Sequence, residues 1–116
     1  MMLDWNEYHK QIQQQIAVIG RTNHDVVKGY RELTNAGSTT NLLGGKVREL
    51  IALAVAVTRQ CDGCIVTHTD AAIKQGATRE EIVEALAVAT AVNAGAALIY
   101  SSRVMDAFDA KIESNK

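Results

Sequence analysis

Apolar side chains recur at intervals of three and four residues near the start of the chain, and this spacing restricts the fold more than any other feature. Five of them share one stripe of a helix predicted over residues 4–20: Trp5, Tyr8, Ile12, Ile16 and Ile19. The 116 residues also include no proline, 17 alanines and only five aromatic side chains, which favours closely packed helices over an antiparallel β fold. The sequence therefore predicts an all-α protein.

Length and charge limit the number of domains and the kinds of partner. With 47% apolar and 22% charged residues, the chain has the composition of one folded domain, expected to span residues 1–116. Twelve basic and 13 acidic residues give a formal charge of −1, so electrostatics supply no reason to bind DNA, RNA or an anionic membrane. We expect no nucleic-acid partner.

The start of the chain and its apolar runs predict where the protein acts. Residues 1–10 lack the basic region and apolar segment of a secretory signal. The longest apolar runs, residues 50–57 and 85–92, fall short of the roughly 18 residues that span a bilayer. We therefore expect a cytoplasmic protein without a membrane partner.

Six helices are predicted from capping residues, glycines and periodicity. The second begins near Asn23 and ends at residues 35–37, before a connecting loop through residues 37–45. The third, residues 46–59, is apolar on most of its surface and should be central. A fourth helix then ends at Gly76.

The last two predicted helices are separated at residues 93–95. Thr78 and Glu81 have the spacing of a capping box at the start of the fifth helix. Residues 93–95, Asn-Ala-Gly, are expected to break or bend the chain. The inward side chains of the sixth helix are then Leu98, Ser101, Met105, Phe108 and Ile112.

Cys61 and Cys64 form a Cys-x-x-Cys unit at the predicted start of the fourth helix, where free amides and the helix dipole stabilise a thiolate. They are too few for the disulfide framework of a small secreted domain, so a chemical role is expected. His68 lies one turn after Cys64 on the same face and could accept its proton. Glu49 is the candidate carboxylate to orient His68, by direct contact or through water.

Structural roles compete for the same residues. Two cysteines on a central helix could be inert, buried apolar side chains, and a lone helical histidine is usually structural. Glu49 could merely complement the dipole in the first turn of its helix. His9 and His24 have no partners at relay or ligand spacing and are expected at the surface.

Three blocks of sequence resemble the family of alkyl hydroperoxidase D and carboxymuconolactone decarboxylase. They are VRELIALA at residues 47–54, CDGCIVTH at residues 61–68 and GATREEI at residues 76–82, and the resemblance runs from residue 46 to 108. The pattern of Glu, eleven residues, Cys-x-x-Cys, three residues and His is similar to that of the hydroperoxidase branch. The decarboxylase branch lacks the cysteine pair.

This resemblance implies an all-helical fold, homo-oligomers of three or six subunits, and an active-site set comprising Glu49, Cys61, Cys64 and His68. It also implies a reductant that is a lipoyl protein, a peroxiredoxin or a thioredoxin-like dithiol protein. Hydroperoxidase D has a histidine directly before the second cysteine, where this chain has Gly63. The amphipathic first helix is a candidate assembly element.

The sequence is therefore interpreted as a thiol oxidoreductase that reduces organic hydroperoxides without a bound cofactor. Cys64 attacks the peroxide and Cys61 closes a disulfide, with His68 as proton acceptor and Glu49 as its orienter. The spacing to His68 favours attack by Cys64, whereas proximity to the free amides favours Cys61, and this assignment stays open.

Three other functions fit parts of the pattern. A lyase acting on a lactone of aromatic catabolism would leave the cysteines incidental. A zinc site could use the same four side chains, although closing a tetrahedron from one helix is difficult. A purely helical assembly module would not account for the spacing of Glu49, Cys61, Cys64 and His68.

Overall fold

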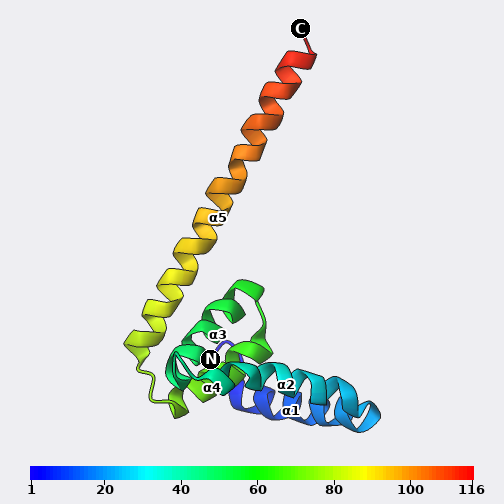
Figure 1. Ribbon diagram of the computed structural model, residues 1–116, viewed down its shortest axis with the longest axis vertical. Coiled ribbons are helices and arrows are strands. Elements are labelled where there is room, and N and C mark those ends of the chain that lie inside the picture. Colours follow the sequence, from blue (N-terminus) through cyan, green and yellow to red (C-terminus); the bar gives the residue numbers. More distant parts are fainter.

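The chain folds into five α-helices and no strands in a computed structural model that describes residues 1–116 (Figure 1). The all-α prediction is therefore confirmed, but the number of helices is five instead of six. The helices are α1 (Trp5–Thr22), α2 (His24–Thr40), α3 (Gly45–Arg59), α4 (Asp62–Lys74) and α5 (Arg79–Ser114).

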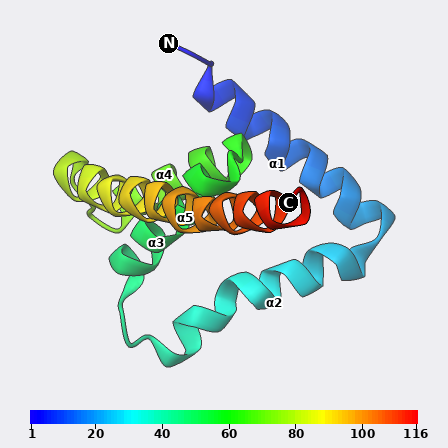
Figure 2. The same ribbon diagram turned by 90° about the horizontal axis from the view of Figure 1, so that it is seen from above.

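The molecule consists of two helical hairpins, α1–α2 and α3–α4, and the long helix α5. α3 packs against both α4 and α5, as expected for the central helix, and α1 packs against α2 and α4. Figure 2 shows α1 and α2 diverging from the short turn that joins them. The first half of α5 lies against α3, and its second half projects alone, which gives the molecule extents of 62 × 38 × 37 Å (Figure 1).

The predicted break at residues 93–95 is wrong, because α5 runs through it as one helix of 36 residues. The side-chain amide of Asn93 donates to the carbonyl oxygen of Ala89 and to Oγ1 of Thr58, each at 2.8 Å. The first bond stays within α5, and the second ties α5 to α3. The glycine at position 95 costs a helix only about 1 kcal/mol, which these contacts offset.

The predicted end of α2 at residues 35–37 is also wrong, since the helix continues to Thr40. The hydroxyls of Ser38 and Thr39 each donate to the carbonyl oxygen three residues earlier, at 2.7 Å, and so stay within the helix. Asn41 ends it in the left-handed conformation, with φ of 49°. The connection to α3 is therefore shorter than the sequence predicts.

The start of α5 is confirmed as a capping box. Oγ1 of Thr78 accepts from the backbone N–H of Glu81 at 3.1 Å, and the Glu81 carboxylate accepts from the backbone N–H of Thr78 at 3.0 Å. Nζ of Lys46 lies 2.8 Å from the same carboxylate. The Lys46 hydrogen bond, followed by the bonds from Thr78, lowers the pKa of Glu81. The first turns of α3 and α5 are thereby joined.

The single chain buries very little. Its buried side chains are Val27, Leu53, Ala56, Val66, Ala72 and Ala89. By length and composition α5 could cross a membrane, a test that core helices of soluble proteins also pass. The apolar run at residues 85–92 did not predict this length, because it stops at Asn93 whereas the helix continues through Asn93 to Ser114.

Candidate redox site

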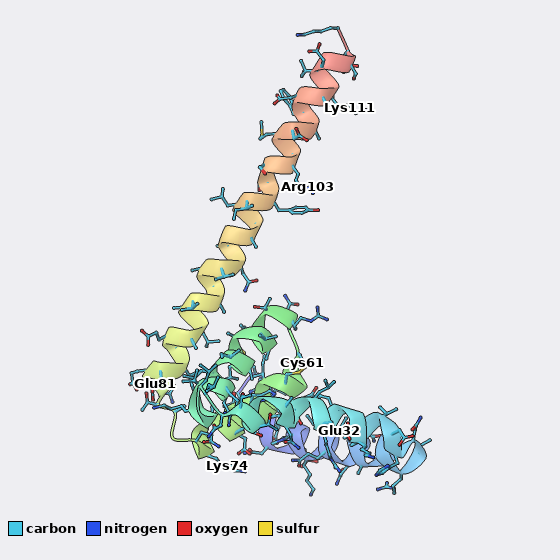
Figure 3. The ribbon with its side chains drawn as sticks, viewed as in Figure 1. Glu32, Cys61, Lys74, Glu81, Arg103 and Lys111 are labelled. Carbon is cyan, nitrogen blue, oxygen red and sulfur yellow. A yellow bond between two sulfur atoms is a disulfide. The ribbon has the colours of Figure 1, made fainter.

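Cys61 and Cys64 are joined by a disulfide at the start of α4, with their Cα atoms 5.3 Å apart. Gln60 ends α3 in the left-handed conformation, with φ of 53°, and so turns the chain directly into Cys61. Figure 3 shows the sulfur-bearing side chain of Cys61 at this turn between α3 and α4. The geometry of the turn therefore places the cysteine pair at a helix N-terminus.

Cys61 is the N-cap residue of α4. Its Sγ accepts a hydrogen bond from the backbone N–H of Cys64 at 3.2 Å. The free amides and the dipole at this end of the helix stabilise negative charge on the same sulfur. When the disulfide opens, charge on Cys61 is therefore favoured by the helix.

Glu49 and His68 meet directly across the α3–α4 interface. Oε2 of Glu49 lies 2.7 Å from Nδ1 of His68, and their side chains keep only 23% and 28% of their exposure. With a neutral imidazole, Nδ1–H donates to the carboxylate and leaves Nε2 free to accept a proton. Of the two contacts considered for this pair, direct or through water, the structure has the direct one.

The antiparallel packing of α3 and α4 brings the four predicted site residues to one region. Glu49 comes from the beginning of α3, while Cys61 precedes α4 and Cys64 lies in its first turn. His68 follows Cys64 by one turn. All four side chains are partly buried. The site is a disulfide beside a carboxylate–imidazole pair, half shielded from water.

α1 adds a contact that the sequence did not indicate. The δ-methyl group of Ile12 packs against Gly63, the residue before the second cysteine. Ile12 belongs to the predicted apolar stripe of α1, but a stripe does not identify the helix that it faces. One wall of the cysteine turn is therefore built by α1.

The other two histidines lie outside this group. His24 is exposed, as predicted. His9 is only partly exposed, and its Nε2 lies 3.3 Å from Nε2 of Gln13. Its charge contributes to lowering the pKa of Asp70, after the larger effect of the hydrogen bond from Lys74. His9 therefore faces α4 more than the sequence predicts.

No group of three or more His, Cys, Asp or Glu side chains in the chain is arranged to hold a metal ion. Both sulfurs are engaged in the disulfide, and Nδ1 of His68 is engaged by Glu49. The four side chains considered as zinc ligands thus form a disulfide, Cys61–Cys64, and a hydrogen-bonded pair, Glu49–His68, in this structure.

Comparisons with known proteins agree on the family to which the chain is similar. The model of the carboxymuconolactone decarboxylase family matches residues 24–107. An uncharacterized protein from Haemophilus influenzae is 40% identical over 108 residues, covering 93% of this chain and 96% of that protein. Another from Cupriavidus necator is 32% identical over 100 residues, covering 86% and 88%.

A solved structure has the same fold. A carboxymuconolactone decarboxylase family protein from Legionella pneumophila, crystallised in its apo form, superposes with a TM-score of 0.73 at 34% sequence identity. The match covers 90% of this chain and 94% of that one. The arrangement of helices described above is thus found in an experimentally determined relative.

Proposed function

The chain belongs to the carboxymuconolactone decarboxylase family, and we propose that it is a thiol-dependent peroxidase that reduces organic hydroperoxides. The observation that carries this proposal is the Cys61–Cys64 disulfide at a helix N-terminus beside the His68–Glu49 pair. A redox-active dithiol needs a stabilised thiolate, a proton acceptor and a second cysteine, and these residues supply all three.

The proposed cycle begins with the reduced dithiol. The Cys64 thiolate attacks one peroxide oxygen, the O–O bond breaks, and the alcohol leaves with the proton that Cys64 had given up. Cys64 is now a sulfenic acid. The Cys61 thiolate then attacks the Cys64 sulfur, the S–O bond breaks as the disulfide forms, and the departing hydroxide takes the proton that Cys61 had given up and leaves as water. An external dithiol returns two electrons and two protons and itself becomes a disulfide.

His68 and Glu49 handle the proton in this cycle. Nε2 of His68 accepts the Cys64 proton and returns it to the departing alcohol. Glu49 fixes the tautomer through Nδ1 and stabilises the imidazolium that forms between these two steps. The 2.7 Å contact supports this assignment because it orients the free nitrogen without a bridging water.

Cys61 fits the role of resolving cysteine. Its sulfur accepts the Cys64 N–H at the end of α4, so the thiolate form of Cys61 is stabilised. A stabilised thiolate is also a good leaving group when an external thiol attacks Cys64 in the disulfide. The same hydrogen bond therefore favours both formation of the attacking Cys61 thiolate and reduction of the disulfide.

Partners and location complete the proposal. The reductant is a lipoyl protein or a thioredoxin-like dithiol protein, and the cycle needs no bound cofactor. The protein acts in the cytoplasm as a homo-oligomer, a trimer or hexamer. The scarcity of buried side chains supports assembly, because a chain with so small a core gains stability by covering its apolar surface with other subunits.

A panel of organic hydroperoxides tests the proposed activity, with dihydrolipoamide, thioredoxin and glutathione as reductants. Peroxide consumption should require both cysteines, and mild peroxide should lower the free thiols of the reduced protein from two to none. The matched controls are Cys61→Ser and Cys64→Ser. Over-oxidation without a disulfide, or consumption unchanged in both variants, would contradict the proposal.

A lyase acting on a lactone is the second candidate, because the matching family model carries the decarboxylase name. In that case the disulfide would be incidental to catalysis. A double Cys61→Ser, Cys64→Ser variant separates the two functions: lactone decarboxylation would survive in it, whereas peroxide reduction would not.

A further inference from the structure

The end of α5 has no partner within the chain. Every residue from 96 to 116, here called the α5 arm, is exposed, and Figure 1 shows this segment projecting alone. A stripe along the arm is apolar at helical spacing, and its large members are Leu98, Met105, Phe108 and Ile112, with exposures of 75%, 60%, 56% and 47%. A lone helix with such a stripe is stable in water only when something covers it.

The arm also carries negative charge beside this stripe. Asp106, Asp109 and Glu113 are three and four residues apart, so they follow one line next to the apolar side chains. Neither aspartate forms an ion pair within the chain, and Glu113 contacts only the terminal Lys116, at 3.4 Å. The arm has as many bases as acids, but its three acids follow one another between Arg103 and Lys116, so it presents an apolar line and beside it a short acidic line.

A second uncovered surface lies between α1 and α2 and has the opposite charge. A groove of about 400 Å³ runs along the two helices, and its apolar side chains are Ile16, Ala17 and Val27. Arg21, Lys28 and Arg31 line it and form no ion pair within the chain. The remaining lining residues are Gly20, His24, Glu32 and Asn35, so cations outnumber the single acid. We call this surface the hairpin groove.

We propose that the α5 arm of one copy of this chain lies in the hairpin groove of a second copy. The apolar stripe then meets Ile16 and Ala17 above the buried Val27, and the acidic line meets the three basic side chains. The arm, about 31 Å long at roughly 1.5 Å per residue, is long enough to follow the groove lining on α2, residues 24–35, which spans about 18 Å. The arm cannot reach the groove of its own chain, because α5 is one continuous helix that leads away from α1 and α2 (Figure 1).

This contact would complete the surroundings of the redox site. A smaller hollow of about 320 Å³ shares Ile16, Ala17 and Arg31 with the hairpin groove and extends to Ile12. Ile12 packs against Gly63 between the cysteines. One end of an arm that lies along the groove is therefore close to the disulfide. The second copy then supplies part of the wall that shields the disulfide.

A membrane is the competing occupant for so apolar a helix. The first half of α5 is already held on α3 by the Lys46–Glu81 ion pair and the Asn93–Thr58 hydrogen bond. The arm itself carries six charged side chains: Arg103, Asp106, Asp109, Lys111, Glu113 and Lys116. Charges inside a bilayer are costly, so these observations favour a protein groove over lipid.

Charge reversal on the α5 arm and on the hairpin groove tests this exchange of arms between copies, in the whole chain. Light scattering should show an oligomer for the wild type and a shift to lower mass for Arg21→Glu with Lys28→Glu, and for Asp106→Lys with Asp109→Lys. Mixing these two variants should restore the assembly, because each arm then meets an oppositely charged groove on the other copy. Lys10→Glu, on α1 outside the groove, is the control and should keep the wild-type mass.

A second readout addresses the site. Alkylation of the reduced cysteines should be several-fold faster in the dissociated variants than in the wild type, and mixing should slow it again. A monomeric wild type, single reversals that leave the mass unchanged, or a mixture that stays dissociated would overturn the exchange. Flotation of the wild type with vesicles of phosphatidylcholine and phosphatidylglycerol would overturn it in favour of a membrane. None of these outcomes depends on peroxidase activity, so the exchange and the proposed function can fail separately.

Discussion

The δ-methyl group of Ile12 lies 3.3 Å from the point that a Cβ atom on Gly63 would occupy. This separation is tighter than ordinary packing, so a side chain at position 63 requires the Ile12 side chain to shift by a few tenths of an ångström. Hydroperoxidase D, which the sequence resembles, has a histidine at this place. In this chain the Ile12 side chain of α1 approaches the position where a Cβ atom would lie, so the packing favours glycine there.

Substitution of Gly63 should therefore loosen α1. Gly63→His should lower the free energy of unfolding by about 1–3 kcal/mol, the usual cost of overpacking, and Gly63→Ala by less. Urea denaturation measures both. Gly29→Ala is the matched control, because nothing lies within 4 Å of the added methyl and alanine favours the helix. A Gly63→His variant as stable as the wild type would show that α1 does not hold its position over the cysteines.

Removal of the imidazole tests the proton acceptor. His68→Ala should lower the peroxidase rate near neutral pH on the order of 10²-fold or more and raise the pH at which a thiol reacts with iodoacetamide. Glu49→Gln should have a smaller effect, because the amide keeps the size and part of the hydrogen bonding but loses the charge. Circular dichroism and light scattering establish that both variants fold and assemble.

The pH profile of alkylation decides the role of His68. A folded His68→Ala variant whose profile superimposes on that of the wild type would exclude His68 as the base. Activation would then come from the helix N-terminus alone, and Cys61, which caps that end, would be the attacking residue.

The order of the two cysteines can be read from single substitutions. Cys61→Ser should still react once with peroxide and accumulate a sulfenic acid on Cys64 that dimedone labels. Cys64→Ser should lose the first step. Mass spectrometry of the dimedone adducts gives the result, and labelling confined to Cys61 in the Cys64→Ser variant would reverse the assignment.

Acid should weaken the contact between the first turns of α3 and α5. The hydrogen bond from Lys46 lowers the pKa of Glu81 in the folded protein below its ordinary value of 4.5. The contact therefore contributes fully above that value and is lost as the pH falls through the lowered pKa. The unfolding free energy of the wild type should fall more steeply below about pH 4.5 than that of Glu81→Gln, which keeps the cap. Glu80→Gln should retain the wild-type slope.

The sequence correctly predicted features that depend only on residues close together in the chain. The capping box of Thr78 and Glu81 depends on residues three apart, and the sequence predicted it correctly. The Glu49–His68 contact was within reach of prediction because a short turn forces α3 and α4 to run antiparallel. The choice between a direct and a water-mediated contact depends on side-chain placement and needed the structure.

Contacts between distant segments decided what the sequence could not predict. The helix continues through Asn93 because Thr58, 35 residues earlier, accepts from its amide. Ile12 was placed on an apolar stripe, but its neighbour Gly63 became evident only from the packing of α1 on α4. Local propensity favoured a break at residues 93–95, which the contact between α5 and α3 overrode. For Ile12, periodicity gave the face of the helix but not the residue that it contacts.

Only six side chains are buried in the chain of 116 residues, so the proposed assembly would make the stability of the fold depend on protein concentration. When subunits complete one another, dilution removes stability by mass action, and the melting temperature rises with protein concentration. A newly made chain would then hold its cysteines in a less shielded state until enough copies have accumulated. The stability of the protein and the reactivity of its thiols would then both follow from the same association equilibrium.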